Sequence, residues 1–459
     1  MFKNDLPMKK VLILGAGLVA GPIIRHLLGH QLTVTIASNT PERAGELVDG
    51  HVNGRVIDWS VEDDATLVSL IEDHDITVSL LPYAYHLKVA KQCIASGKNM
   101  VTTSYVKPEM QALDPQARQA GVLILNEIGL DPGIDHMSAM RIIDHIHGKG
   151  GKVVEFYSIC GALPAPESAV NPFRYKFSWS PRGVLLASGN DGRYLKNGKI
   201  VEVPTGELFS HIFRLNFEHV GPLDVYANRN STDYIDIYGI PGVETIFRGT
   251  FRIPGWCESL DAMKKLQLLS DDHYHIHGMT YAEFLMSVNK LHGIEPVKAV
   301  ADFLGLPADA VPLQALQWLG WFDPKDIGRE ESTAFDITAD LMLSKMDLRE
   351  NDRDMVVMKH LFTASYPDGS REGITSSMLA FGSPASETAI ARTVTLPAAI
   401  AVEMILQGRI TEKGVHRPVL RGIYEPVLQE LEKLGITMDE KFNLPLGNKG
   451  VWDIGTDNV

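Results

Sequence analysis

The stretch Val11-Leu12-Ile13-Leu14-Gly15-Ala16-Gly17-Leu18-Val19-Ala20 decides the fold of this chain. Its four leading residues are all apolar, which is typical of a strand buried on both faces. The GxGxxA pattern that follows is a dinucleotide-binding fingerprint when it joins a strand to a helix. Gly15 permits the tight turn, Gly17 lets the backbone approach a pyrophosphate, and Ala20 keeps helix and strand close. The stretch therefore predicts a dinucleotide phosphate at the start of a helix.

Strand and helix patterns alternate at short spacing through the first 133 residues. The predicted strands are 11–14, 32–37, 56–57, 76–80, 99–103 and 122–125, and the predicted helices are 18–28, 41–48, 64–72, 85–96 and 108–120. Strands joined by helices in this way form parallel sheets with right-handed crossovers. We therefore expect an α/β fold with a doubly wound parallel sheet of the Rossmann type.

The pattern changes after about residue 133. Strand-like pieces follow at 153–159, 223–227, 234–237 and 245–253, and a hairpin over 355–365 and 372–380 turns at Pro367-Asp368-Gly369. Helical patterns cover 281–291, 297–304, 313–319, 334–343, 395–407 and 426–434. These patterns predict a second, mixed α/β domain and a smaller helical domain.

The composition excludes several classes of function. The chain has 459 residues with 43 basic and 57 acidic side chains, a net charge of −14, and no dense basic run, so no nucleic-acid partner is expected. No apolar stretch is long enough for a membrane span. The three cysteines, Cys93, Cys160 and Cys257, are far apart, which favours free thiols in a reducing cytoplasm.

The end of the second predicted strand bears on the choice of dinucleotide. Enzymes that use NAD usually place an acidic residue there to bind the ribose 2′-hydroxyl, but this chain has Ser38-Asn39-Thr40. Small polar residues can surround a 2′-phosphate, and Arg43 lies within reach on the next helix. The pattern favours NADP and leaves NAD open, with Glu42 as the residue that would then bind the ribose.

Two polar segments follow later strands of the same predicted sheet. Residues 102–105 (TTSY) follow the fifth strand, and residues 126–136 (NEIGLDPGIDH) follow the sixth. Ligands bind beyond the carboxyl ends of parallel strands, so both segments are expected at the ligand site. The carboxylates and histidine of the second segment can perform acid–base chemistry. Alternatively, Asp135 simply caps the next helix.

An aromatic loop and several arginines mark the second predicted domain. Residues 164–180 are rich in proline and aromatic side chains, Arg229 lies in NRNST, and two arginines frame RGTFR at 248–252. Guanidinium groups bind carboxylates with two parallel hydrogen bonds. A substrate with carboxylate groups is therefore favoured.

Six segments together resemble the saccharopine dehydrogenases of the glutamate-forming type, also called saccharopine reductases. They are SLLPY (79–83), VTTSY (101–105), NEIGLDPGIDH (126–136), GALPAPES (161–168), YKFSWSPRGVL (175–185) and RGTFR (248–252). The resemblance implies the reversible conversion of saccharopine into L-glutamate and aminoadipate semialdehyde, with NADP, in lysine metabolism. It also implies a homodimer and a variant Rossmann domain over 1–133 with 385–459. The mixed domain would cover 134–259 with 345–384, and the helical domain 260–344.

The resemblance also assigns residues to the two ligands. Saccharopine contacts are expected from Ser104, Tyr105, Asp131, Trp179, Arg229, Thr250, Phe251 and Arg252, and cofactor contacts from Gly15, Ala16, Gly17, Leu18, Ser38, Asn39, Thr40, Asp58, Leu81 and Thr103. Tyr105 and Asp131 are the candidate catalytic acid–base groups, and no metal is expected. Fungal members carry arginine where this chain has Asn39, and Arg43 is the residue that would substitute for it.

Two other functions are alternatives to this one. Carboxynorspermidine and homospermidine synthase-like enzymes reduce a related imine formed with a diamine, but the arginines and the YKFSW loop favour saccharopine. A non-catalytic dinucleotide-binding protein would lack residues that bind a substrate, whereas this chain has the segments expected at the substrate site. The expected location is the cytoplasm.

Overall fold

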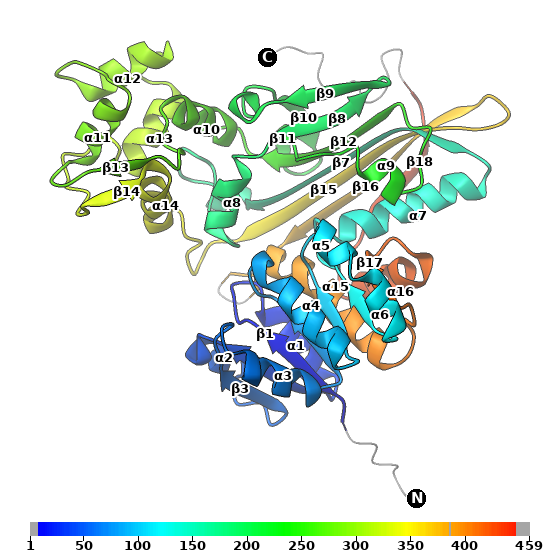
Figure 1. Cartoon of the computed structure of the whole chain (residues 1–459). Coiled ribbons are helices and arrows are strands. Elements are labelled where there is room, and N and C mark those ends of the chain that lie inside the picture. The colour runs from blue at the N-terminus through cyan, green and yellow to red at the C-terminus, as the bar shows by residue number, and fades with distance from the viewer. Residues whose placement is uncertain (1–7, 385–386, 447–459) are drawn as a thin grey trace, which may run out of the picture. The chain divides into compact units, whose positions relative to one another are not determined.

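The computed structural model describes residues 8–384 and 387–446, which form two compact units (Figure 1). The first unit contains residues 8–151, 376–382 and 387–440. The second contains residues 152–375, 383–384 and 441–446. The predicted three-domain division stays a prediction, and its residues 1–7, 385–386 and 447–459 lie outside the described residues.

The first unit is built on a seven-stranded parallel sheet in the order β17-β6-β5-β4-β1-β2-β3. Its strands are β1 (Lys10–Leu14), β2 (Thr33–Ser38), β3 (Gly54–Asp58), β4 (Ile76–Ser79), β5 (Asn99–Thr102), β6 (Leu123–Leu125) and β17 (Gly414–His416). The first six strands confirm the predicted doubly wound sheet. β17 was not predicted, because three residues carry too little periodicity to be recognised.

Helices connect these strands and enclose the sheet. They are α1 (Gly21–Gly29), α2 (Pro41–Val48), α3 (Asp64–Glu72), η1 (Tyr83–Tyr85), α4 (His86–Ala95), α5 (Pro108–Gln111), α6 (Asp114–Gln119), α7 (Ile134–Gly148), α15 (Ala389–Leu406) and α16 (Arg421–Lys433). The single helix predicted over 108–120 is wrong, because two helices, α5 and α6, lie in this range. Pro115 lies in the first turn of α6, and proline has no N–H with which to continue an earlier helix. Among the described residues, α15 is long and apolar enough to cross a membrane, but 78% of it is buried in the protein, as in a core helix.

The second unit is built on a nine-stranded mixed sheet. Its main path is β10-β11-β12-β7-β15-β16-β18, with β8 paired to β12 and β9 paired to β8. The strands are β7 (Lys152–Pro164), β8 (Gly192–Lys196), β9 (Lys199–Val203), β10 (Phe213–Phe217), β11 (Gly221–Ala227), β12 (Thr245–Arg252), β15 (Asp354–Ser365), β16 (Arg371–Phe381) and β18 (Asp439–Leu444). β12 runs parallel to β7 and antiparallel to β11, which confirms a mixed sheet.

The remaining segments of the second unit are mainly helical. They are α8 (Pro181–Ala187), α9 (Tyr234–Ile237), α10 (Trp256–Lys265), α11 (Tyr281–Val288), α12 (Pro296–Leu304), α13 (Val311–Leu319) and α14 (Ala334–Lys345), with η2 (Pro166–Ser168), η3 (Thr205–Glu207), β13 (His273–His275) and β14 (Glu331–Thr333). The strand predicted over 234–237 is wrong, because these residues form α9. Four residues are too few to separate a strand pattern from a helical turn.

Candidate functional site

The glycine turn lies where the strand order of the first sheet reverses, between β1 and β4. Ligands of open α/β sheets bind at this switch point, beyond the carboxyl ends of the strands. Gly15 has a φ of +103°, and a Cβ atom there would lie 3.2 Å from the carbonyl oxygen of Leu80, directly after β4. A Cβ atom on Gly17 would meet nothing within 4 Å. The turn therefore leaves open space beside the start of α1, which is what a phosphate group requires.

The other predicted cofactor residues lie at the same edge of this sheet. They are Ser38, Asn39 and Thr40 at the end of β2, Asp58 at the end of β3, Leu81 after β4 and Thr103 after β5. The Ser38 and Thr40 hydroxyl oxygens are 3.0 Å apart, and Asn39 between them is exposed. Asp58 is exposed and paired in register with Ser38. This edge therefore carries polar groups from both adjacent strand ends.

Arg43 of α2 connects this polar edge to the glycine turn. Its Nε donates a hydrogen bond of 2.9 Å to the carbonyl oxygen of Ala16. Its two terminal nitrogens make no hydrogen bond within residues 8–384 and 387–446. The next residue in the turn, Leu18, is 53% exposed, so it presents an apolar side chain at the same turn. Arg43 can therefore brace the turn while its terminal nitrogens remain able to bind an anion.

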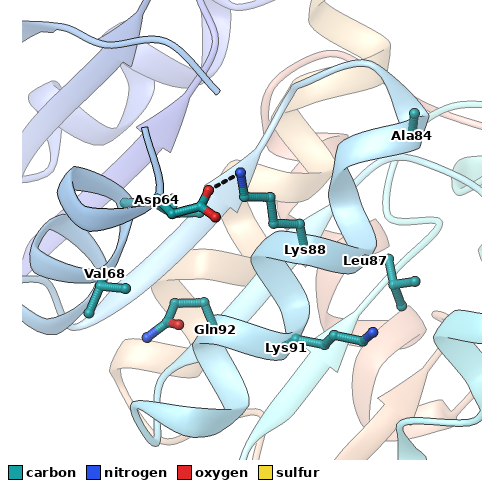
Figure 2. A pocket seen from close by; sticks show the side chains of 8 residues that line it. Asp64, Val68, Ala84, Leu87, Lys88, Lys91 and Gln92 are labelled. Atoms are coloured by element: carbon teal, nitrogen blue, oxygen red, sulfur yellow. Dashed lines mark ion pairs between the residues drawn. The ribbon is translucent and has the colours of Figure 1, made fainter. Parts of the chain in front are cut away.

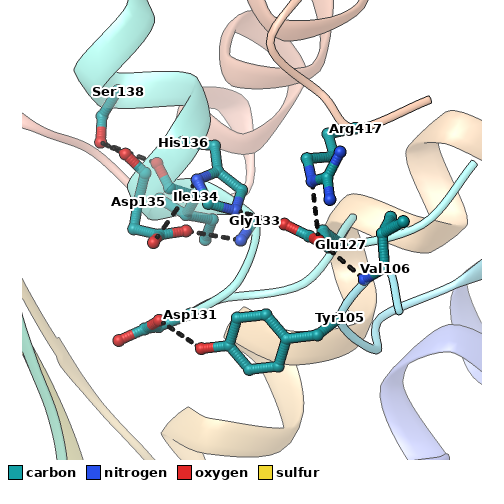
Figure 3. Close-up of polar contacts among 10 residues, drawn as sticks. All are labelled: Tyr105, Val106, Glu127, Asp131, Gly133, Ile134, Asp135, His136, Ser138 and Arg417. Atoms are coloured by element: carbon teal, nitrogen blue, oxygen red, sulfur yellow. Dashed lines mark hydrogen bonds and ion pairs between the residues drawn. The ribbon is translucent and has the colours of Figure 1, made fainter. Parts of the chain in front are cut away.

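The segments after β5 and β6 bring the two candidate catalytic residues together (Figure 3). The hydroxyl group of Tyr105 donates a hydrogen bond of 3.1 Å to Oδ1 of Asp131. A close turn follows Asp131: a Cβ atom on Gly133, which has a φ of +148°, would lie 2.0 Å from the carbonyl oxygen of Gly129. Asp135 accepts the N–H of Gly133 at 2.6 Å. The alternative that Asp135 caps this helix is wrong, because the N-cap of α7 is Gly133, without a side-chain capping hydrogen bond, and Asp135 lies inside the first turn.

A buried ionic network supports both segments, and the sequence did not identify it as a unit. Glu127 accepts the backbone N–H of Val106 at 2.7 Å, Nε2 of His136 at 2.8 Å and Nε of Arg417 at 2.9 Å (Figure 3). Burial by itself raises the pKa of Glu127, but the His136 hydrogen bond and the charges of His136 and Arg417 outweigh burial and lower the pKa. The carboxylate therefore stays ionised and fixes the backbone beside Tyr105.

A second buried chain of hydrogen bonds reaches Ser104. Nδ1 of His86 lies 2.9 Å from Oγ of Ser79, and Nε2 lies 2.7 Å from Oγ of Ser104. Burial lowers the pKa of His86 to about 4, so the ring is neutral at physiological pH. A neutral imidazole donates through one nitrogen and accepts through the other, which orients the Ser104 hydroxyl group. His86 lies three residues after the SLLPY segment and is the first residue of α4, and this closeness to the end of β4 is the sequence signal that could have identified it.

In the second unit, Arg252 at the end of β12 is a buried cation among aromatic rings. Its guanidinium carbon lies 5.2 Å from the Tyr175 ring centre, 5.7 Å from that of Tyr226 and 5.5 Å from that of Trp256. Arg252 is 4% exposed, and in the described part of the chain its hydrogen bonding is limited to the Phe251 carbonyl group. Its Nε is buried without a hydrogen-bond partner there. A buried charge of this kind is costly unless an anion binds it.

The other predicted substrate residues of this unit lie on β12 and on two loops. Thr250 and Phe251 belong to β12, and a Cβ atom on Gly161 of β7 would lie 2.7 Å from the Phe251 Cβ. Trp179 precedes α8 and is partly exposed. Arg229 is exposed after β11, with a φ of +56°. The backbone carbonyl group of Arg229 accepts the N–H of Arg193 at 2.9 Å, which ties its loop to β8.

A separate hollow of about 470 Å³ lies between α3 and α4 (Figure 2). It is lined by Asp64, Leu67, Val68, Ala84, Leu87, Lys88, Lys91 and Gln92. Lys88 forms an ion pair with Asp64 across it. None of the predicted site residues lines this hollow, so it adds nothing to the site at the strand ends.

A doubly wound sheet with an open glycine turn at its switch point defines a dinucleotide-binding protein. The comparisons with known proteins specify the family. Residues 11–125 match the family described as "Saccharopine dehydrogenase NADP binding domain", and residues 129–436 match "Saccharopine dehydrogenase C-terminal domain". The chain belongs to the saccharopine dehydrogenase family.

Individual relatives agree with this assignment. The chain is 38% identical to "Saccharopine dehydrogenase [NADP(+), L-glutamate-forming]" of Pyricularia oryzae, over 94% of this chain and 99% of the relative. It is 36% identical to the rat "Alpha-aminoadipic semialdehyde synthase, mitochondrial", but spans only 48% of that longer protein. The solved apo structure of the Saccharomyces cerevisiae saccharopine dehydrogenase (L-Glu forming) matches with a TM-score of 0.88 and 36% identity, over 95% of this chain and 99% of the other.

Proposed function

We propose that this chain is an NADP-dependent, L-glutamate-forming saccharopine dehydrogenase. It oxidises the secondary amine of saccharopine to an imine, and water then releases L-glutamate and aminoadipate semialdehyde. In the reverse direction, these two compounds condense to the imine, which is then reduced to saccharopine. The near full-length similarity to enzymes of this name supports the reaction. The structural observation that carries it is Arg252, a buried guanidinium group that no described carboxylate neutralises. Saccharopine has three carboxylates that can do so.

The residues at the switch point suit NADP. The open turn at Gly15 and Gly17 would hold the pyrophosphate, and the hydroxyl groups of Ser38 and Thr40 would surround the 2′-phosphate with Arg43. When bound, the nicotinamide ring supplies the chemistry of hydride acceptance or donation. The protein's own contribution is therefore to bind the substrate, orient it and manage its protons.

Each group has a role that follows from its environment. Arg252 would neutralise a substrate carboxylate in a desolvated pocket of aromatic rings, where an ion pair is strong. Asp131 would bind the amino group and, with Tyr105, transfer protons during the steps that add or remove water. Ser104, oriented by His86, would donate or accept one further hydrogen bond. Trp179, Arg229, Thr250 and Phe251 complete the proposed substrate contacts.

Oxidation of saccharopine tests the proposed function directly. With purified enzyme and saccharopine, we expect absorbance of the reduced nicotinamide to rise with NADP, and L-glutamate to accumulate in equal amount. The ratio of kcat/KM with NADP to that with NAD measures the cofactor preference. Absence of reduction with both cofactors would refute the assignment. Tight NADPH binding without turnover would instead indicate a non-catalytic dinucleotide-binding protein.

Replacing Arg43 tests the 2′-phosphate contact. Arg43→Ala removes a cation from α2, the helix that directly follows Ser38 and Thr40, so the KM for NADP should rise about 10-fold, the loss expected for one charge-assisted hydrogen bond. The KM for NAD should change much less, although loss of the bond to Ala16 affects both cofactors. Arg55→Ala on β3 is the matched control, since Arg55 is also an exposed arginine of this unit. Equal effects on both cofactors would show that Arg43 only braces the turn.

Four finer features are also proposed. The family resemblance supports a homodimer and the division into nucleotide-binding, mixed α/β and helical domains. The net charge of −14 supports a protein without nucleic-acid partners, and the reduced thiols of Cys93, Cys160 and Cys257 suit the cytoplasm.

A further inference from the structure

Two histidines and a glutamate converge on one point between helices α1 and α15 of the first unit. His26 and His30 are four residues apart on α1 and at its end, so both side chains lie on one face. Nε2 of His26 is 3.1 Å, and Nδ1 of His30 is 3.2 Å, from the same oxygen, Oε1 of Glu403. The two imidazole rings are 4.3 Å apart between centroids. The three ligand atoms lie within 4.8 Å of one another.

Hydrogen bonding does not account for the approach of His26 to Glu403. Nε2 of His26 and Oε1 of Glu403 are both buried, and neither has a hydrogen-bond partner within the described residues despite their 3.1 Å separation. No arginine or lysine in the described ranges forms an ion pair with Glu403, and its ion pairs there are those with the two histidines. A buried carboxylate oxygen beside two imidazole nitrogens is a donor set that suits a divalent transition-metal ion.

The distances also fit a metal. Zinc binds histidine nitrogen and carboxylate oxygen at about 2.0–2.2 Å, so ligand atoms of a tetrahedral site lie about 3.3 Å apart. The two measured separations, 3.1 and 3.2 Å, are close to that value. The spacing of His26 and His30 is the i, i+4 spacing that zinc-binding helices use.

We propose that His26, His30 and Glu403 bind one divalent transition-metal ion of the zinc type, with water as the fourth ligand. The metal would join the end of α1, whose opposite end begins at the glycine turn, to the core helix α15. Its role is structural, because none of the predicted catalytic residues belongs to the cluster. The inference does not depend on the proposed reaction.

No metal was expected from the sequence, and no local sequence pattern reveals this cluster. Glu403 is far from the histidines along the chain, and only the packing of α1 against α15 brings it to them. One contact competes with the metal: Nδ1 of His30 is also 2.7 Å from the carbonyl oxygen of His26. A proton on Nδ1 would satisfy this oxygen, so metal binding must displace that proton.

Titration of ZnCl₂ into untagged, chelator-treated full-length protein tests the proposal. We expect calorimetry to show one tight site per chain. The thermal midpoint should rise by about 5 °C when free Zn²⁺ is 100-fold above its dissociation constant. Co²⁺ in the same site should give the strong visible absorption of a tetrahedral complex, which octahedral surface binding does not give.

Variants assign the site to these residues. His30→Ala changes a side chain that is 53% exposed, and Glu403→Gln preserves side-chain volume, so both should fold. Each should weaken Zn²⁺ binding by at least about 10-fold, the loss expected from perturbing a metal site. His277→Ala is the matched control, because His277 forms an exposed 2.7 Å pair with Glu330 alone and its loss should leave tight binding intact.

Two outcomes would overturn the proposal. One is the absence of a tight site in the wild-type protein, which would identify the cluster as a contact between the two helices that binds no metal. The other is tight binding that persists unchanged in both His30→Ala and Glu403→Gln. Saccharopine turnover is measured separately, so failure of the metal site and failure of the proposed reaction are distinguishable.

Discussion

Replacing Arg252 by methionine is expected to lower kcat/KM for saccharopine by about 10²–10³-fold, the loss typical of truncating one partner of a buried charge pair. Methionine has a similar length and no charge, so it fills the space among Tyr175, Tyr226 and Trp256 without binding a carboxylate. The steady-state oxidation of saccharopine measures the loss, and NADP binding should be unchanged.

The same substitution should not destabilise the free protein. In the described residues the Arg252 side chain is buried without an ion pair, so its charge has a desolvation cost that the aromatic rings offset only in part. We therefore expect the thermal midpoint of Arg252→Met to stay the same or rise while activity falls. Arg252→Lys should recover only part of the activity, because an ammonium group lacks the paired donors of guanidinium.

A matched control variant distinguishes loss of the Arg252 charge from general damage to the sheet. Arg193→Met alters an arginine on the neighbouring strand β8 that is 47% exposed and 3.6 Å from Glu202. It should leave both activity and stability nearly unchanged, as expected for an exposed ion pair. Wild-type kcat/KM in Arg252→Met would show that this guanidinium group does not bind the substrate.

The first sheet was largely predictable because its signals are local. The apolar run before Gly15 and the alternation of strands and helices identify a doubly wound sheet, and the structure confirms strands β1 to β6. The errors occur where the local pattern is short, as in 234–237, or where a proline restarts a helix, as in α6. The periodicity of apolar residues cannot distinguish helix from strand in 234–237 or locate the start of α6, because hydrogen bonding within a single turn decides the backbone conformation there.

The supporting residues of the candidate site were not predictable in the same way. Arg417 reaches Glu127 across 290 positions of sequence, and His86 reaches both Ser79 and Ser104 only after the strands are assembled. Single-sequence patterns contain motifs but no tertiary contacts. The motif NEIGLDPGIDH could therefore suggest acid–base chemistry without showing that its glutamate is structural, with its pKa lowered by His136 and Arg417.

Replacing Asp131 by asparagine is the second test with a large expected effect. The amide oxygen can still accept the 3.1 Å hydrogen bond from Tyr105, and the side-chain volume is preserved, so the change removes mainly the charge. If Asp131 binds the substrate amine and transfers protons, kcat/KM for saccharopine should fall about 100-fold, within the range for general acid–base groups. If kcat/KM falls only because KM rises, Asp131 contributes to binding alone. If kcat itself falls, Asp131 takes part in proton transfer.

The first unit contains a matched control for this substitution. The hydroxyl group of Tyr424 donates a 2.5 Å hydrogen bond to Oδ2 of Asp144, another tyrosine–aspartate pair, which joins α16 to α7. Asp144→Asn should change stability more than catalysis. Tyr105→Phe combined with Asp131→Asn should cost much less than the product of the two single losses, since the two residues act as one unit. Wild-type kcat/KM in Asp131→Asn would exclude Asp131 from the reaction, and fully multiplicative losses would show that Tyr105 acts independently of it.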